Sequence, residues 1–124
     1  MNKKILTVIL AVVICIGLFA FSVSANENVP EGIWTDYAAK DFGGGSGTKD
    51  DPYLLATAEQ IAKLAADINS GVYDRDHSNE YFKLTDNIDL SAHRWIPIGS
   101  GTATTSMHAF RGYFDGDGHT VSGM

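Results

Sequence analysis

The stretch YLLATAEQIAKLAADINSG, residues 53–71, carries the clearest secondary-structure signal in the chain. Thr57 and Gln60 have the spacing of a capping box, in which the threonine oxygen accepts a backbone N–H and the glutamine reaches back to the helix start. Asn69-Ser70-Gly71 supplies the glycine expected where a helix ends. Apolar residues recur at helical spacing between these signals, namely Ile61, Leu64, Ala65 and Ile68. The stretch predicts an amphipathic helix, preceded by a short strand at 53–55.

After residue 80 the apolar pattern changes from helical spacing to alternation, which is typical of strands. Three short strand runs are expected, at 81–90 with a kink at Asp86-Asn87, at 95–99, and at 110–123 around a turn. The apolar residues at even positions should point into one core beneath the helix: Phe82, Leu84, Ile88, Leu90, Ile96, Ile98, Phe110 and Phe114. Many short strands separated by glycine turns predict a mainly β sandwich, barrel or solenoid.

The first 25 residues have the pattern of a secretory signal peptide. Lys3 and Lys4 form a positive start, residues 5–21 are almost all apolar, and Val23-Ser24-Ala25 supplies small residues at the cleavage site. The alternative is an uncleaved membrane anchor, although the apolar run is shorter than the roughly 20 residues that span a bilayer. We therefore expect a secreted or cell-surface protein.

Cleavage after Ala25 would leave 99 residues of the 124, without the single cysteine, Cys15. Such a chain has no disulfide, thiol nucleophile or thiolate metal site. Removing Lys3 and Lys4 also changes the formal net charge from −6 to −8. This charge repels nucleic acid and anionic lipid, so neither nucleic acid nor a membrane is an expected partner after cleavage.

Residues 26–50 are interpreted as a polar, Gly-rich leader that ends in GGGSGT at 43–48. The glycine and serine content is typical of a flexible segment. The ordered domain is therefore expected to begin near Asp51 and to cover residues 51–124.

Several motifs occur in an order that resembles a known architecture. They are GSGTKDDPYLL at 45–55, TAEQIAKLA at 57–65, YFKLTDNIDL at 81–90, WIPIG at 95–99 and FRGYFDGDGHTVSGM at 110–124. This order resembles the start of bacterial surface proteins that form a right-handed parallel β-helix and often continue into GLUG-type repeats. The resemblance implies a solenoid whose open end is capped by one N-terminal α-helix, with the FDGDGHT segment turning the chain between rungs.

The resemblance also implies more chain than is present. A Gly-Leu-Phe-Gly repeat would be expected after Met124, so we interpret the chain as a truncated product with incomplete rungs. About three repeats are usually needed to bury a continuous solenoid core. An unpaired end rung would expose a strand edge and apolar side chains, so self-association through that end is expected.

Asp115-Gly116-Asp117-Gly118 admits three interpretations. Asp-Gly pairs favour a tight turn, because glycine accepts positive φ and aspartate bonds nearby backbone groups. Asp115 and Asp117 are also weak candidates for calcium, although no further acid follows at the spacing of a calcium loop. A catalytic pair would need a substrate groove between two supported carboxylates. The turn is the preferred interpretation.

No catalytic or cofactor-binding residue is assigned from the sequence, and no cofactor is expected, with calcium as a weak alternative. The four histidines lack the i+3 or i+4 spacing of a zinc site, and no Gly-x-Ser-x-Gly nucleophile motif occurs. Trp95 and Tyr113 are weak candidates for stacking on sugar rings, with packing as the alternative for such aromatic residues.

Three functions are compatible with these sequence features. The first is a non-catalytic structural or adhesive segment of an exported cell-surface protein. The second is the N-terminal part of a polysaccharide-active enzyme whose catalytic rungs lie downstream. The third is a small carbohydrate-binding module. Polysaccharides and cell-wall or host-surface glycans are the expected partners in each case.

The small residues at 23–25 predict cleavage immediately before Asn26. N-terminal sequencing of chain recovered from the culture medium should therefore start at Asn26. Secreted chain that starts at Met1 would contradict the signal-peptide interpretation.

Overall fold

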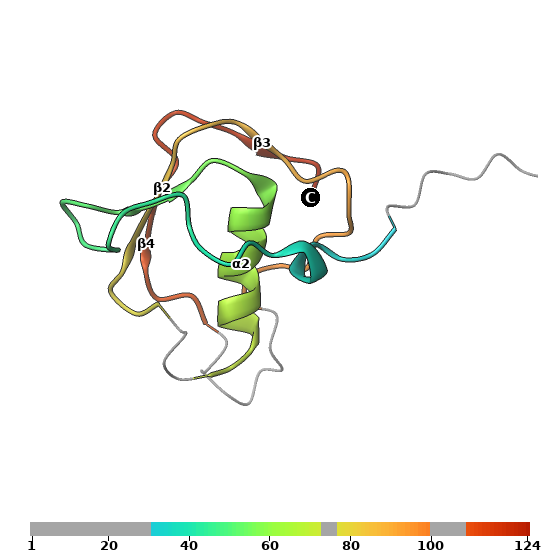
Figure 1. Ribbon diagram of the computed structural model, residues 1–124, viewed down its shortest axis with the longest axis horizontal. Helices are drawn as coiled ribbons and strands as arrows, with labels where there is room; N and C mark the ends of the chain where they lie inside the picture. The colour runs from blue at the N-terminus through green and yellow to red at the C-terminus, as the bar shows by residue number, and fades with distance from the viewer. Residues whose placement is uncertain (1–30, 73–76, 100–108) are drawn as a thin grey trace, which may run out of the picture.

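The computed structural model describes residues 31–72, 77–99 and 109–124, so the predicted signal peptide lies outside the described residues. The described elements surround one central helix (Figure 1). In chain order they are the 3-10 helix η1 (Trp34–Tyr37), strand β1 (Tyr53–Leu55), helix α2 (Ala58–Asn69), and strands β2 (Tyr81–Leu84), β3 (Ile88–Asp89), β4 (Tyr113–Asp115) and β5 (Val121–Ser122).

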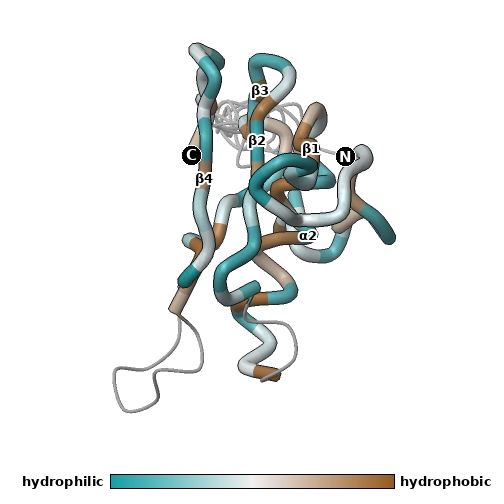
Figure 2. The backbone as a smooth tube through the Cα atoms, turned by 90° about the vertical axis from the view of Figure 1, so that its left-hand side faces the viewer, coloured by the Kyte–Doolittle hydropathy of each residue, from teal (hydrophilic) through white to brown (hydrophobic). Residues whose placement is uncertain are grey.

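The strands form two small parallel sheets. The first has the order β1-β2-β4, and the second pairs β3 with β5. In the first sheet Phe82 lies between Tyr53 on β1 and Phe114 on β4. Figure 2 shows β1, β2 and β4 as successive layers, with β4 on the outside. Because every strand pair is parallel, the chain runs from the end of one strand to the start of its partner through a connection longer than a hairpin turn.

The predicted capping box at the start of α2 is confirmed. Gln60 N–H lies 3.4 Å from Thr57 Oγ1, while Gln60 Oε1 accepts from Thr57 N–H at 3.3 Å and from Ala56 N–H at 2.7 Å. At the other end, Gly71 has φ 65° and its N–H donates to Ile68 O. The helix boundaries therefore follow from local side-chain chemistry, as the sequence indicated.

Helix α2 supplies five of the eleven buried apolar residues. The buried set is Trp34, Leu55, Ile61, Ala62, Leu64, Ala65, Ile68, Phe82, Leu84, Ile88 and Leu90. The prediction that the even-numbered apolar residues of 82–90 point inward is thus confirmed. The same prediction is wrong for Phe114, which is 45% exposed although it pairs with the buried Phe82. An inward position is buried only where a further layer covers it.

The predicted fold class, a mainly β start of a right-handed parallel β-helix with a capping helix, is wrong. The described residues instead form a 12-residue α-helix and strands of two to four residues in two small parallel sheets. The predicted strand at 95–99 is absent. Instead, the side chain of Asn69 bonds this segment, donating to Pro97 O at 3.1 Å and accepting from Gly99 N–H at 2.8 Å.

The expectation that the ordered domain begins near Asp51 is also wrong for the described part of the leader. Trp34 is only 5% exposed, and its indole N–H donates to Leu90 O at 2.6 Å. Ile33 forms a parallel bridge with Arg94, and Ala39 N–H donates to Glu59 O at 2.9 Å. Residues 31–50 therefore pack on the core, because a buried tryptophan holds them there despite their polar composition.

The glycine-rich segment has a definite structure beside β1. Gly43 N–H donates to Leu54 O at 2.8 Å, and Leu54 N–H donates to Gly44 O at 3.0 Å. At Gly45, φ is +83° and a Cβ would lie 1.9 Å from Pro52 O. At Gly47, φ is +77° and a Cβ would lie 2.4 Å from the Tyr53 ring. These two positions require glycine because both the backbone angle and the available space exclude a side chain.

Thr57→Ala should lower the free energy of unfolding by about 1 kcal/mol, because it removes the oxygen that caps the Gln60 N–H. Urea denaturation monitored by far-UV circular dichroism measures this loss. Thr85→Ala, on an exposed residue outside the helix, is the matched control and should change stability much less. Equal effects of the two substitutions would contradict the role of the capping box.

Candidate functional site

An open groove of about 380 Å³ lies beside strands β2 and β4 of the first sheet. Strands β2 and β4 supply most of it, and the segment before β1 supplies the remainder. Aromatic residues and residues of both charges are among those that line it: Lys49, Pro52, Tyr81, Phe82, Lys83, Tyr113, Phe114 and Asp115. Such a mixture of apolar surface and a few polar groups is typical of a ligand site.

Two stacked tyrosines form the aromatic part of the groove. Tyr81 and Tyr113 are direct neighbours in the β2–β4 register, and their ring centroids lie 4.3 Å apart with planes inclined by 10°. Tyr113 is 53% exposed and β4 is the last strand of its sheet. Stacking fixes both rings in one orientation, so this pair offers a preformed flat surface.

Charged groups lie next to the tyrosines. Lys83 pairs with Asp115 in the strand register, and its ammonium group contacts Asp117 Oδ2 at 2.9 Å. The hydrogen bond to Asp117, followed by the charge of that carboxylate, raises the pKa of Lys83 above its ordinary value. A protonated donor and carboxylate acceptors are therefore present together at this edge of the groove.

The two carbohydrate candidates from the sequence do not meet. Tyr113 lies in the groove, whereas Trp95 is half-buried, packs against the core and is not among the residues that line it. Sequence reasoning missed Tyr81 and Lys83 as groove residues. Their odd positions in an alternating run, opposite the buried Phe82 and Leu84, were the signal that they face outward.

The Asp-Gly-Asp-Gly segment forms the predicted turn, between β4 and β5. Asp115 Oδ1 accepts from Asp117 N–H at 2.9 Å, and Gly116 O accepts from His119 N–H at 2.7 Å. Asp117 and Gly118 both have positive φ, 43° and 79°. Calcium binding by the two aspartates stays a prediction. Among the described residues no group of three or more His, Cys, Asp or Glu is arranged to hold a metal ion.

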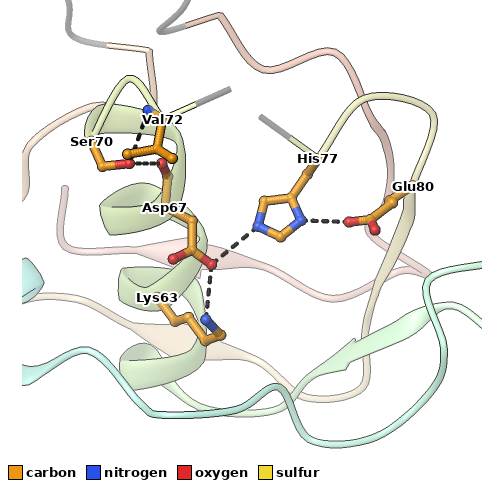
Figure 3. Close-up of polar contacts among 6 residues, drawn as sticks. All are labelled: Lys63, Asp67, Ser70, Val72, His77 and Glu80. Carbon is orange, nitrogen blue, oxygen red and sulfur yellow. Dashed lines mark hydrogen bonds and ion pairs between the residues drawn. The ribbon is translucent and has the colours of Figure 1, made fainter. Parts of the chain in front are cut away.

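A second cluster of polar side chains lies between α2 and the start of β2 (Figure 3). His77 is at its centre, with Nε2 3.1 Å from Asp67 Oδ2 and Nδ1 2.5 Å from Glu80 Oε2. Lys63 Nζ also contacts Asp67 Oδ2, at 2.8 Å. The side chains of His77 and Asp67 are each 13% exposed. This cluster, which we call the His77 cluster, comprises Lys63, Asp67, His77 and Glu80.

The environment of the His77 cluster changes two pKa values. Burial lowers the pKa of His77, but hydrogen bonds with Asp67 and Glu80 and the charges of both carboxylates outweigh it and raise the pKa above 6.5. Burial raises the pKa of Asp67, but hydrogen bonds from His77 and Lys63 and their positive charges bring it below 3.8. Both shifts favour the ionised pair at mildly acidic pH.

The geometry of the His77 cluster suits a structural role. Both ring nitrogens of His77 already contact carboxylates, so neither is free to act on a substrate. The rings of Phe42, Tyr53 and Phe82 surround the imidazole at 5.3 to 6.5 Å. The Lys63–Asp67 pair has the i,i+4 spacing that a sequence reveals. The partnership of His77 with Asp67 depends on the fold.

No model of a known protein family matches the chain, and no solved structure matches it. The chain is 37% identical over 116 residues to halomucin of Haloquadratum walsbyi, a match that covers 85% of this chain and 1% of halomucin. It is 31% identical over 89 residues to a Gly-rich membrane protein of Evansella cellulosilytica, covering 67% of this chain and 9% of that protein. The chain therefore spans a small part of either relative. Within residues 31–72, 77–99 and 109–124, no helix is long and apolar enough to cross a bilayer.

The His77 cluster should make stability depend on pH in two directions. Because the pKa of His77 is raised on folding, its contribution is fully present below pH 6.5 and is lost as the pH rises through the raised value. Because the pKa of Asp67 is lowered on folding, its contribution is present above pH 3.8 and is lost as the pH falls through the lowered value.

His77→Gln should therefore abolish most of the stability loss that accompanies a rise in pH above about 6.5, as measured by urea denaturation at a series of pH values. His119→Gln is the matched control, because the His119 side chain makes no ion pair with any described residue. An unchanged pH profile in His77→Gln would contradict the assigned role.

Proposed function

We propose that this chain is a non-catalytic, exported structural or adhesive segment of a secreted or cell-surface protein. The similarities to halomucin and to a membrane protein indicate a surface or membrane location, and the signal-peptide pattern at 1–25 supports the finer assignment to secretion or the cell surface. The small fraction of each relative that is matched supports a role as one segment of a longer surface protein.

The groove beside Tyr81 and Tyr113 is the observation that carries the adhesive part of the proposal. A flat aromatic surface suits the apolar face of a sugar ring, and the adjacent Lys83 and Asp115 offer a hydrogen-bond donor and an acceptor for hydroxyl groups. A polysaccharide or a cell-wall or host-surface glycan is thus the proposed partner.

The charges of the groove favour a hydroxyl-rich ligand over a highly charged one. Lys49 and Lys83 would repel a polycation, whereas Asp115 and the neighbouring Asp117 would repel a polyanion. A neutral saccharide can use both kinds of group as hydrogen-bond partners without either repulsion. The His77 cluster supports a non-catalytic role because its histidine is held at both nitrogens.

Tyr113→Ala should weaken binding to polysaccharide by about two- to tenfold, since one stacking contact is worth about 0.5–1.5 kcal/mol. The assay is co-sedimentation of the purified chain with insoluble polysaccharides and isolated cell walls. Tyr37→Ala is the matched control, because Tyr37 is 48% exposed and lies outside the groove. Failure to sediment with every material, or equal binding by both variants, would contradict the proposed site.

A further inference from the structure

Strand β4 has an open edge. Within the part of the chain that the structure describes, it pairs with β2 on one side and has no strand on the other. Figure 2 shows it as the outermost layer of the three strands. Unpaired strand edges are templates for pairing with another strand.

The backbone of Phe114 faces this edge. Tyr113 N–H donates to Glu80 O at 2.8 Å, so the backbone groups of Tyr113 point towards β2. Successive residues in a strand direct their N–H and C=O groups to opposite sides, so those of Phe114 point away from β2. At the centre of β4, the backbone N–H and C=O groups of Phe114 thus face the open edge as one donor and one acceptor.

The side chain of Phe114 also lacks full cover. It lies opposite the buried Phe82 in the register, on the inward face, yet it is 45% exposed. Val121 is in the equivalent position on β5, opposite the buried Ile88, and is half-buried. The open end of the core therefore combines free backbone groups with apolar side chains that a further layer would bury.

The opposite edge of the same sheet is closed. Leu54 on β1 exchanges backbone hydrogen bonds with Gly43 and Gly44, at 2.8 and 3.0 Å. A second copy cannot place its β4 against β1 without displacing this segment. Head-to-tail stacking of copies is therefore blocked, and pairing of β4 with β4 remains, which gives a closed two-fold arrangement.

We propose that two copies of this chain pair through β4 in antiparallel orientation, with the two-fold axis at Phe114. Phe114 N–H of each copy donates to Phe114 C=O of the other, so the two Phe114 residues form a hydrogen-bonded antiparallel pair. The exposed Phe114 rings then lie side by side and cover one another. Gly112 and Gly116, on either side of β4, become opposite partners without a side chain to obstruct the approach.

The charges disfavour a shift of this register towards Gly116. With the axis at Phe114, Asp115 lies opposite Tyr113 of the other copy, so no carboxylate faces a carboxylate and all of β4 is paired. A shift of the axis to Gly116 would place Asp115 opposite Asp117 of the other copy, and like charges directly opposite are unfavourable. The pairing goes beyond saccharide binding and does not depend on it.

Sedimentation velocity of the full chain over a range of concentrations tests the pairing, with far-UV circular dichroism to confirm folding. We expect a monomer–dimer equilibrium that Phe114→Pro weakens by about tenfold or more, because proline removes the N–H that each copy donates. Tyr37→Ala, which changes another exposed aromatic residue, is the control and should leave the equilibrium unchanged. A monomer at all concentrations, or a dimer that Phe114→Pro leaves intact, would overturn the proposal.

A cysteine experiment tests the register without relying on proline. In a Cys15→Ser background, Phe114→Cys should form a disulfide-linked dimer, because residues opposite each other in a hydrogen-bonded pair have Cα atoms about 5.5 Å apart, within disulfide range. Tyr113→Cys should crosslink far less, since its opposite partner is Asp115, and Tyr113→Cys combined with Asp115→Cys should restore crosslinking. Equal crosslinking by the two single variants would overturn the assigned register.

Discussion

The backbone hydrogen bonds between Leu54 and the Gly43–Gly44 segment are the constraint on which the rest of the sheet depends. They satisfy the outer edge of β1, so the sheet is extended only from its other side, through β2 to β4. The close approach requires glycine at Gly45, where a side chain would overlap Pro52. A glycine-rich run that reads as a linker is thus a closely fitted edge of the fold.

Helix α2 and the segment around Trp34 connect this sheet to the second one. The indole of Trp34 is buried and its N–H is satisfied by Leu90 O, the residue that follows β3. Ala39 N–H bonds Glu59 O in the first turn of α2. One segment before β1 therefore contacts both the helix and the end of the β3 run, and a buried indole with a satisfied donor suits that position.

Local signals in the sequence were sufficient for the parts of the fold that depend on neighbouring residues. The Thr57–Gln60 cap and the alternation from Phe82 to Leu90 both have a physical cause within a few residues, and both are confirmed. The exposure of Phe114 was not predictable from its even position in an alternating run. Alternation indicates which way a side chain points, but not whether a further layer covers it. The solenoid prediction failed for the same reason, since short alternating runs do not specify how many layers assemble.

In the candidate site, too, some features are encoded by neighbouring residues and others depend on the assembled fold. The turn at Asp115–Gly118 is encoded locally by Asp-Gly chemistry. The Tyr81–Tyr113 stack and the contact of His77 with Asp67 join residues from different elements, so they depend on the register and on the position of α2. The aromatic ring of Trp95 is its sole sequence signal for sugar binding, and its packing against the core reflects the commoner fate of large aromatic residues.

Amide hydrogen exchange, followed by NMR on dilute chain, tests the central claim that one edge of the sheet is closed and the other open. Slow exchange is expected for the amides of Gly43 and Leu54, which are hydrogen-bonded at the closed edge, and fast exchange is expected for the amide of Phe114 at the open edge. Exchange of the Gly43 amide at the rate of an unfolded chain, while the β2 amides stay protected, would show that this edge of the sheet is not closed.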